Sequence, residues 1–150
     1  MAANPDTHIA EGGDIRPHLT GDAQESLLRW LEEHQPSAHS DVGNDLLSAV
    51  RAEGGEWLAF SPSWGSCRYV AIVRSGQVCA LAHGQQTACF RVRAEAQADA
   101  IALGGRIRPE LGEGWLSFEM YFRTKPAPDL RAWMRAAYGA LEARSPEIAP

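Results

Sequence analysis

The chain has 150 residues, of which 45% are hydrophobic and 22% charged, and its formal net charge is −5 at pH 7. This length usually forms one domain with a sizeable core, and the composition is that of an ordinary globular protein. The net negative charge argues against attraction of the whole molecule to nucleic acid or to acidic membranes.

The N-terminal region carries no targeting or membrane signal. No apolar run in the chain approaches the roughly 20 residues that cross a bilayer. Residues 1–20 lack the apolar stretch after a basic start that marks a secretory signal. They are polar and show no periodicity, which predicts a disordered arm. We therefore expect a cytoplasmic protein.

Two helices are predicted after this arm. The first spans residues 22–34, where Asp22 and Glu25 fit a capping box. The second spans residues 42–53, with Asp41 as its cap and apolar residues at helical spacing.

Short strand-like runs and two further helices make up the rest of the chain. The strand runs lie at residues 56–60, 67–73, 77–83, 87–92, 106–108 and 115–122, and the helices at 94–103 and 130–144, the last capped by Asp129. Residues 74–77 suit a two-residue hairpin. This turn predicts the pairs Ile72–Cys79 and Val70–Leu81, and Leu81 then faces Cys89 in the next strand.

Alternation along residues 67–93 divides the side chains between two faces. One face is wholly apolar and carries Tyr69, Ala71, Val73, Val78, Ala80, Ala82, Ala88, Phe90 and Val92. The other face is apolar in its middle and bears Arg68, Arg74, Arg91, Arg93 and His83 toward its ends. Whether the N-terminal helices cover this second face is open at this point.

Together these elements predict an α+β fold. We expect an antiparallel meander of about five or six strands, packed by helices on one side and extended by two N-terminal helices. A single domain should cover residues 21–145, with a helical part at 21–55, the sheet-bearing part at 56–145 and a tail at 146–150.

The three cysteines favour buried free thiols. Cys67, Cys79 and Cys89 are odd in number, form no C-x-x-C and lie in apolar runs. This pattern argues against a disulfide framework and against a zinc site. A thiol enzyme that uses Cys67 or Cys89 remains an alternative, because His83 could lie near Cys67 at the open end of the first hairpin.

Other catalytic and metal-binding patterns are weak. Ser63 and Ser66 lie in a loop without a G-x-S-x-G elbow. The spacing of His34, His39 and Asp41 does not place two metal ligands on one helical face. We therefore expect no catalytic residue, no metal and no cofactor.

The order of parts from residue 66 to residue 144 resembles a known family. The matching segments read VRSGQVCAL at 73–81, CFRVRAEAQADAIALGG at 89–105, GWLSFEMYF at 114–122 and DLRAWMRAAYGAL at 129–141. A strand pair that meets at a glycine turn, a basic strand before a helix that ends at glycine, and a late strand before a Trp-bearing helix are similar to the TfoX N-terminal domain and the MmcQ/YjbR group. Gln77 stands where that family usually has a basic residue.

The resemblance implies a fold of the kind called double-wing DNA-binding, and with it a binding or regulatory role. The leading expectation is a non-catalytic cytoplasmic binding or regulatory module with a protein partner. DNA binding through the arginine-bearing face is the alternative, and a small thiol enzyme is the second alternative. The candidate binding residues are Arg68, Arg74, Arg91, Arg93, His83 and Trp64.

Overall fold

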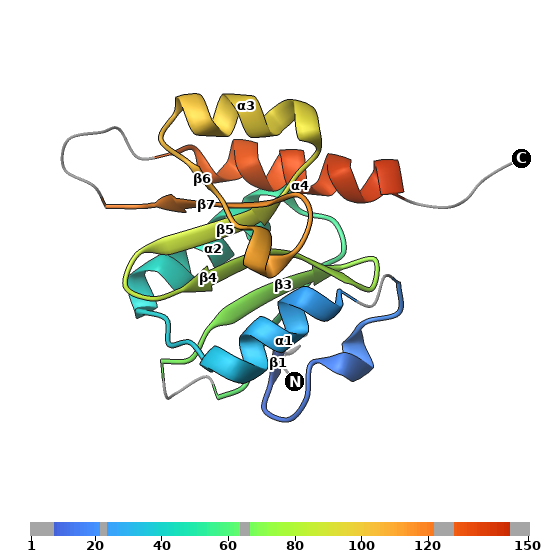
Figure 1. Cartoon of the computed structure of the whole chain (residues 1–150). Coiled ribbons are helices and arrows are strands. Elements are labelled where there is room, and N and C mark those ends of the chain that lie inside the picture. The colour runs from blue at the N-terminus through green and yellow to red at the C-terminus, as the bar shows by residue number, and fades with distance from the viewer. Residues whose placement is uncertain (1–7, 22–23, 64–66, 122–127, 145–150) are drawn as a thin grey trace, which may run out of the picture.

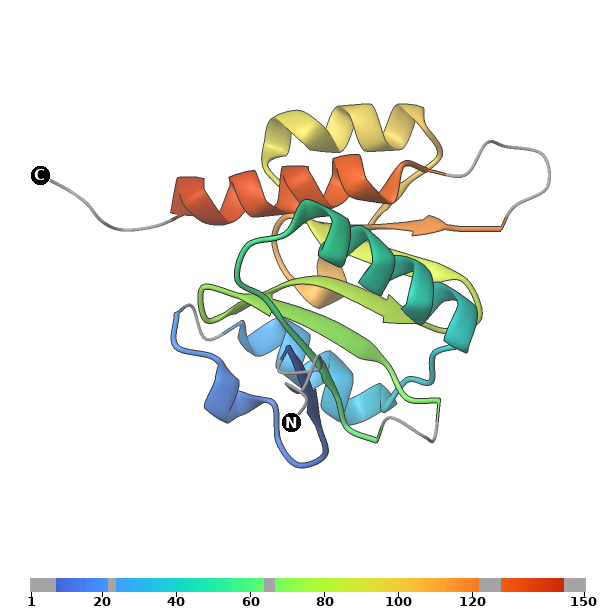
Figure 2. The same cartoon turned by 180° about the vertical axis from the view of Figure 1, so that it is seen from behind.

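The computed structural model describes residues 8–21, 24–63, 67–121 and 128–144. In these residues a seven-stranded sheet forms the middle layer, and helices lie on both of its faces (Figure 1, Figure 2). The α+β class predicted from the sequence is confirmed. No helix in the described part is both long and apolar enough to cross a membrane.

The elements have the following bounds. The strands are β1 (Ile9–Glu11), β2 (Leu58–Ser61), β3 (Val70–Arg74), β4 (Gln77–His83), β5 (Thr87–Arg91), β6 (Arg106–Ile107) and β7 (Trp115–Glu119). The helices are α1 (Glu25–His34), α2 (Ser40–Glu53), α3 (Ala94–Ala102) and α4 (Leu130–Arg144), with short 3-10 turns η1 (Arg16–His18) and η3 (Pro109–Leu111).

The strands follow the order β1-β2-β3-β4-β5-β7-β6 across the sheet, so β1 and β6 are its edges. Neighbouring strands are antiparallel except β1 and β2, which run parallel. The strand-like run predicted at 106–108 forms β6, which pairs with β7 at the far edge. Strand β7 takes the place beside β5.

The hairpin between β3 and β4 contains a one-residue shift. Val73 pairs with Val78 as the turn requires, but Ile72 pairs with Ala80. Cys79 is therefore an extra residue in β4, as in a β-bulge, and every later side chain changes face. The predicted pairs Ile72–Cys79 and Val70–Leu81 are wrong, whereas Leu81–Cys89 is confirmed.

The shift divides the predicted apolar face between two cores. The core on the side of α2 and α4 includes Val42, Leu46, Val50, Val70, Ile72, Ala80, Ala82, Ala88, Phe90, Leu116, Trp133 and Met134. The core on the side of α1 includes Leu27, Leu28, Leu31, Phe60, Tyr69, Ala71, Val73, Val78, Leu81, Cys89, Leu111 and Trp115. Helices thus cover both faces of the sheet, and the expectation of helices on one side is wrong.

Residues 8–21 are part of the fold rather than a disordered arm. The His8 carbonyl oxygen accepts a hydrogen bond from Ala59 N at 2.7 Å, and Gly12 N donates to Ser61 O at 2.9 Å. The His8 ring stacks on Trp57 with centroids 4.3 Å apart. These contacts hold β1 along β2, which lies about fifty residues later in the chain. Because this pairing is not local, no sequence pattern around residues 9–11 predicts β1.

Two helix starts differ from prediction. Helix α1 begins at Glu25, and the predicted cap Asp22 lies outside the described residues. Helix α2 begins at Ser40, where His39 Nδ1 accepts from Asp41 N at 3.1 Å, so His39 caps the helix instead of Asp41. The cap of α4 is as predicted, since a carboxylate oxygen of Asp129 accepts from two backbone N–H groups of its first turn.

Candidate functional site

The bulge separates arginines that the sequence placed on one face. Arg74 lies on the α2–α4 side, with its guanidinium 3.8 Å from the centroid of the Tyr138 ring. Arg91 pairs with Trp115, a residue of the α1-side core, and therefore lies on the opposite face. It is buried and donates to the Gln77 side-chain oxygen at 3.1 Å.

The remaining candidates are also dispersed. Arg93 is exposed beside α3, and its Nε lies 3.4 Å from a Glu95 carboxylate oxygen. Arg68 precedes β3 at the end opposite Arg74. Trp64 lies outside the described residues. The four arginines that the sequence placed on a common face therefore do not share one surface.

His83 belongs to a polar cluster on the α1 side, which we call the Arg108 cluster. The Arg108 side chain is buried and donates from Nε to Glu110 at 2.5 Å. Its Nη1 lies 3.3 Å from His83 Nε2 and 3.7 Å from Cys89 Sγ. The guanidinium also lies 5.5 Å from the centroid of the Trp30 ring.

The members of the Arg108 cluster fix one another's protonation states. Burial, followed by the charge of Arg108, lowers the pKa of His83 to about 4, so its imidazole is neutral at pH 7. Burial acts to raise the pKa of Glu110, but the hydrogen bond and charge of Arg108 outweigh it and the pKa is lowered. These mutual contacts indicate a structural role.

The three thiols are in different environments. Cys79 and Cys89 are buried, and burial raises the pKa of each to about 12. Cys67 is exposed, and its φ of 55° places it in the left-handed region. The expectation of a buried thiol is therefore wrong for Cys67, because β3 starts only at Val70 and Cys67 lies in the preceding turn.

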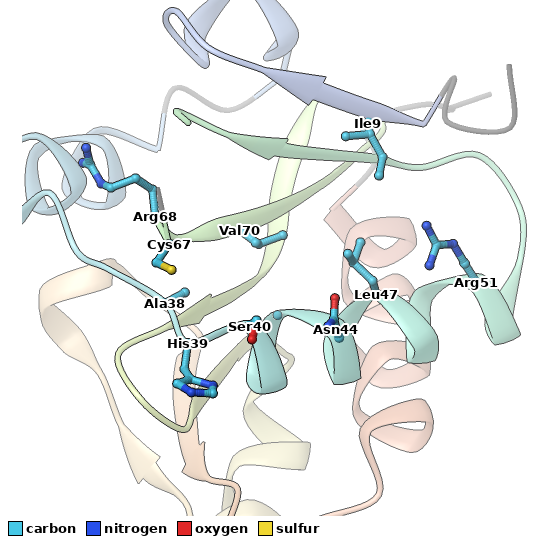
Figure 3. Close-up of a pocket in the computed structure, with 11 residues that line it drawn as sticks. Ile9, Ala38, His39, Ser40, Asn44, Leu47, Arg51, Cys67, Arg68 and Val70 are labelled. Atoms are coloured by element: carbon cyan, nitrogen blue, oxygen red, sulfur yellow. The ribbon is translucent and has the colours of Figure 1, made fainter. Parts of the chain in front are cut away.

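A cavity of about 410 Å³ lies between α2 and the sheet, where Ile9 of β1 and Val70 of β3 line it (Figure 3). We call it the α2 groove. It is lined by Ile9, Ala38, His39, Ser40, Gly43, Asn44, Leu47, Arg51, Cys67, Arg68 and Val70. Its volume falls in the range of roughly 300–1,000 Å³ that is common for small-molecule sites.

One face of α2 forms the length of the groove. Ser40, Gly43, Asn44, Leu47 and Arg51 recur at three- and four-residue spacing, which aligns them along one side of a helix. The distance from the first to the last is about 16 Å at ~1.5 Å per residue. Figure 3 shows Ser40, Asn44, Leu47 and Arg51 one after another along α2, with Ile9 on the opposite side of the cavity, so the groove runs along the helix.

The groove has an apolar floor and a polar rim. Leu47 and Val70 are buried beneath it, whereas Ser40, Asn44 and Arg51 are exposed along it. A site of this composition holds the body of a ligand by apolar contact and fixes its orientation with a few hydrogen bonds.

Two arginines, Arg51 and Arg68, are among the described residues that line the groove, and no aspartate or glutamate is. His39 also lines it, and its Nδ1 lies 3.7 Å from a carboxylate oxygen of Asp41. Neither arginine forms an ion pair with a described residue, and Arg68 Nε is buried without a hydrogen-bond partner there. Figure 3 shows the Arg68 guanidinium turned away from the groove, whereas Arg51 reaches from α2 toward the sheet edge.

Gly43 keeps the groove open. A Cβ built at this position would meet only Val70 Cγ2, at an ordinary contact distance of 3.5 Å. A glycine inside a helix costs roughly 0.5–1 kcal/mol relative to alanine. No steric need for glycine is seen at Gly43, and the space it leaves is part of the groove.

The groove shows no arranged catalytic pair. Cys67 and His39 both line it, but His39 Nδ1 is occupied by the cap of α2, and no hydrogen bond joins it to the Cys67 thiol. A nucleophile and its base need such contact. Among the described residues no group of three or more His, Cys, Asp or Glu side chains could hold a metal ion.

A second space of about 400 Å³ lies between α3 and α4. Only Arg93, Glu95, Ala96, Ala136 and Gly139 border it, and the first two are paired with each other. It offers small apolar side chains and no unpaired polar group of the described chain converging on it, so the α2 groove is the better candidate.

Sequence reasoning missed Ser40, Asn44 and Arg51 altogether. The available signal was their spacing on the predicted second helix, where polar residues and a glycine follow one helical face. No sequence pattern predicts the opposite wall of the groove, because Ile9 lies there only through the pairing of β1 with β2.

Comparisons with known proteins supply no relative for this chain: no protein-family model, curated protein or solved structure matches it.

Proposed function

We propose that this protein is a non-catalytic binding module that holds a small molecule in the α2 groove. The observation that carries the proposal is the groove itself: a cavity of about 410 Å³ with a buried apolar floor and exposed polar side chains along its rim. Preformed cavities of this kind are the usual location of small-molecule sites.

The proposal retains the regulatory role, cytoplasmic location and protein partner expected from the sequence. The resemblance to the TfoX and YjbR group stays a prediction from the sequence. In such a module the ligand would act by stabilising the groove conformation, since a ligand shifts an equilibrium only through differential binding.

The alternatives receive less support from the geometry. DNA binding needs several cations along one surface, and Arg74 and Arg91 lie on opposite faces. Thiol chemistry needs a thiolate beside a base, and the described contacts of Cys67 include none.

The proposal is tested by screening a chemically diverse fragment library with amide NMR spectra of the whole chain. We expect hits that perturb the amides of Gly43, Asn44, Leu47 and Val70 together, because these residues surround one cavity.

The matched pair for this screen is Gly43→Leu and Gly139→Leu. Both glycines lie in helices, and an added Cβ would meet Val70 Cγ2 at an ordinary 3.5 Å at Gly43 and nothing within 4 Å at Gly139. Only the leucine side chain of Gly43→Leu would extend into the α2 groove. Loss of the hits in Gly43→Leu alone supports the proposal. Hits that persist in Gly43→Leu, or that never map to the groove, overturn it.

A further inference from the structure

We propose that the α2 groove selects an elongated molecule with an apolar body and an anionic end group, and that Arg51 binds this anion. The inference rests on the proposed function, because it names the class of ligand for the same groove.

The charge of the groove walls is opposite to that of the chain. The sequence has 19 acidic residues against 14 lysines and arginines. The groove is nevertheless lined by Arg51, whose guanidinium lies beside it, and no carboxylate is found among its described lining residues. A cleft lined by one sign of charge concentrates ligands of the other sign.

Arg51 forms no ion pair with a described residue although a carboxylate is close by in the sequence. Glu53 follows it by two residues on α2 but accepts hydrogen bonds from Arg131 at 2.9 Å and from Arg135 at 3.0 Å, both on α4. These bonds lower the pKa of Glu53, with Arg135 the larger cause, and keep it ionised. Arg51 instead extends along the groove side of α2 (Figure 3).

The shape and the apolar lining of the groove determine the length and the polarity of the ligand body. Between Arg51 and Ser40 the α2 face runs for about 16 Å. The middle of the groove is formed by the buried side chains of Leu47 on α2 and Val70 on β3. A hydrocarbon body can lie there while its anionic end meets the guanidinium, since arginine binds planar anions such as carboxylates through two hydrogen bonds.

The test compares octanoate with octanol, which share the same chain and differ in the charge of the end group. Amide NMR titrations of the whole protein measure both dissociation constants. We expect octanoate to perturb Gly43, Asn44, Leu47 and Arg51 and to bind about tenfold more tightly than octanol, the size of one charge-assisted hydrogen-bonded contact.

The arginine is tested with Arg51→Gln and a matched control. Arg106→Gln removes the same charge from an exposed arginine of β6 that forms no ion pair with a described residue. Arg51→Gln should bring the two dissociation constants to within about twofold of each other, whereas Arg106→Gln should retain the tenfold preference.

Each remaining outcome contradicts one of the two proposals. Equal binding of octanoate and octanol in the groove, or an unchanged preference in Arg51→Gln, overturns the anion inference and leaves the proposed function standing. If neither molecule perturbs the groove amides, or both still bind when Asn44→Trp narrows the groove, the anion inference falls. The fragment screen with Gly43→Leu then decides the proposed function separately.

Discussion

The α2 groove and the Arg108 cluster each bring together arginine, histidine and cysteine side chains. In the Arg108 cluster, Arg108 contacts Glu110, His83 and Cys89, and its side chain is almost wholly buried. In the groove, the arginines form no ion pair with a described residue, the thiol is exposed, and open space lies between them.

Residue type alone therefore does not mark a functional site in this protein. Removing a buried cation leaves its hydrogen-bond partners unpaired, which destabilises the fold. A cation beside a cavity with no partner in the chain contributes little to stability and remains available to a ligand. The two regions should therefore respond in opposite ways to the same substitutions.

The largest expected effect is on stability when Arg108 is removed. Arg108→Met should lower the free energy of unfolding by about 2–4 kcal/mol, because Glu110 and His83 lose a buried partner. Arg51→Met should change it by less than about 0.5 kcal/mol, as is usual at exposed positions. Urea denaturation at pH 7 measures both variants, and equal losses would contradict the distinction between the two regions.

The second largest expected effect is a difference in the rate at which the three cysteines react with a thiol reagent. Cys67 should react with an aromatic disulfide reagent at the rate of an unfolded thiol, whereas Cys79 and Cys89 should react at least about a hundredfold more slowly, since they are exposed only by opening of the structure. All three should react together in denaturant. Simultaneous labelling of the three under native conditions would show that the two cores are not closed.

The Arg108 cluster should also make stability depend on pH. The pKa of His83 is about 4 in the folded protein and near 6.5 when unfolded. Between these values the unfolded chain binds a proton that the folded chain does not, so this residue lowers stability as pH falls from 6.5 toward 4. The loss should reach roughly 2–3 kcal/mol.

The substitution His83→Gln keeps a group that can accept from Arg108 and should remove this part of the pH dependence. Urea midpoints of the two proteins should therefore differ progressively below pH 6.5, with the exposed His34→Gln as control. Parallel curves for wild type and His83→Gln would mean that His83 is not held neutral by the cluster.

The smallest effect concerns the two helical glycines. Gly43→Ala and Gly139→Ala should each raise the free energy of unfolding by roughly 0.5–1 kcal/mol, because both positions have room for a methyl group. Only Gly43→Ala should also weaken octanoate binding, since only its methyl group enters the groove. Weaker binding in both variants, or in neither, would argue against a groove kept open by Gly43.

Much of the fold can be predicted from the sequence because its signals are local. Strand β4 has the predicted bounds, and Asp129 caps α4 as its position indicated. The bulge at Cys79 could not be predicted from the sequence, because the tight turn at residues 74–77 fits a strand pair with or without the bulge. Only packing on both faces of the sheet selects the bulged register. Strand β1 was missed because its three residues pair with a distant segment.

The groove was less predictable than the fold. Its walls come from β1, α2 and the start of β3, and no contiguous motif joins Ile9, Arg51 and Val70. The candidate arginines were chosen from a register that the bulge changes, so Arg74 and Arg91 were grouped although they lie on opposite faces. Arg51 could be recognised as a candidate binding residue only after the structure showed which arginines have partners and which of them lies beside a cavity.

The most direct test of the account is a crystal structure of the whole chain grown with octanoate. The account predicts the hydrocarbon between Leu47 and Val70, with its carboxylate within hydrogen-bonding distance of the Arg51 guanidinium. Octanoate bound instead against the exposed apolar side chains of Ile101 and Leu103, or an empty α2 groove at saturating octanoate, would contradict it.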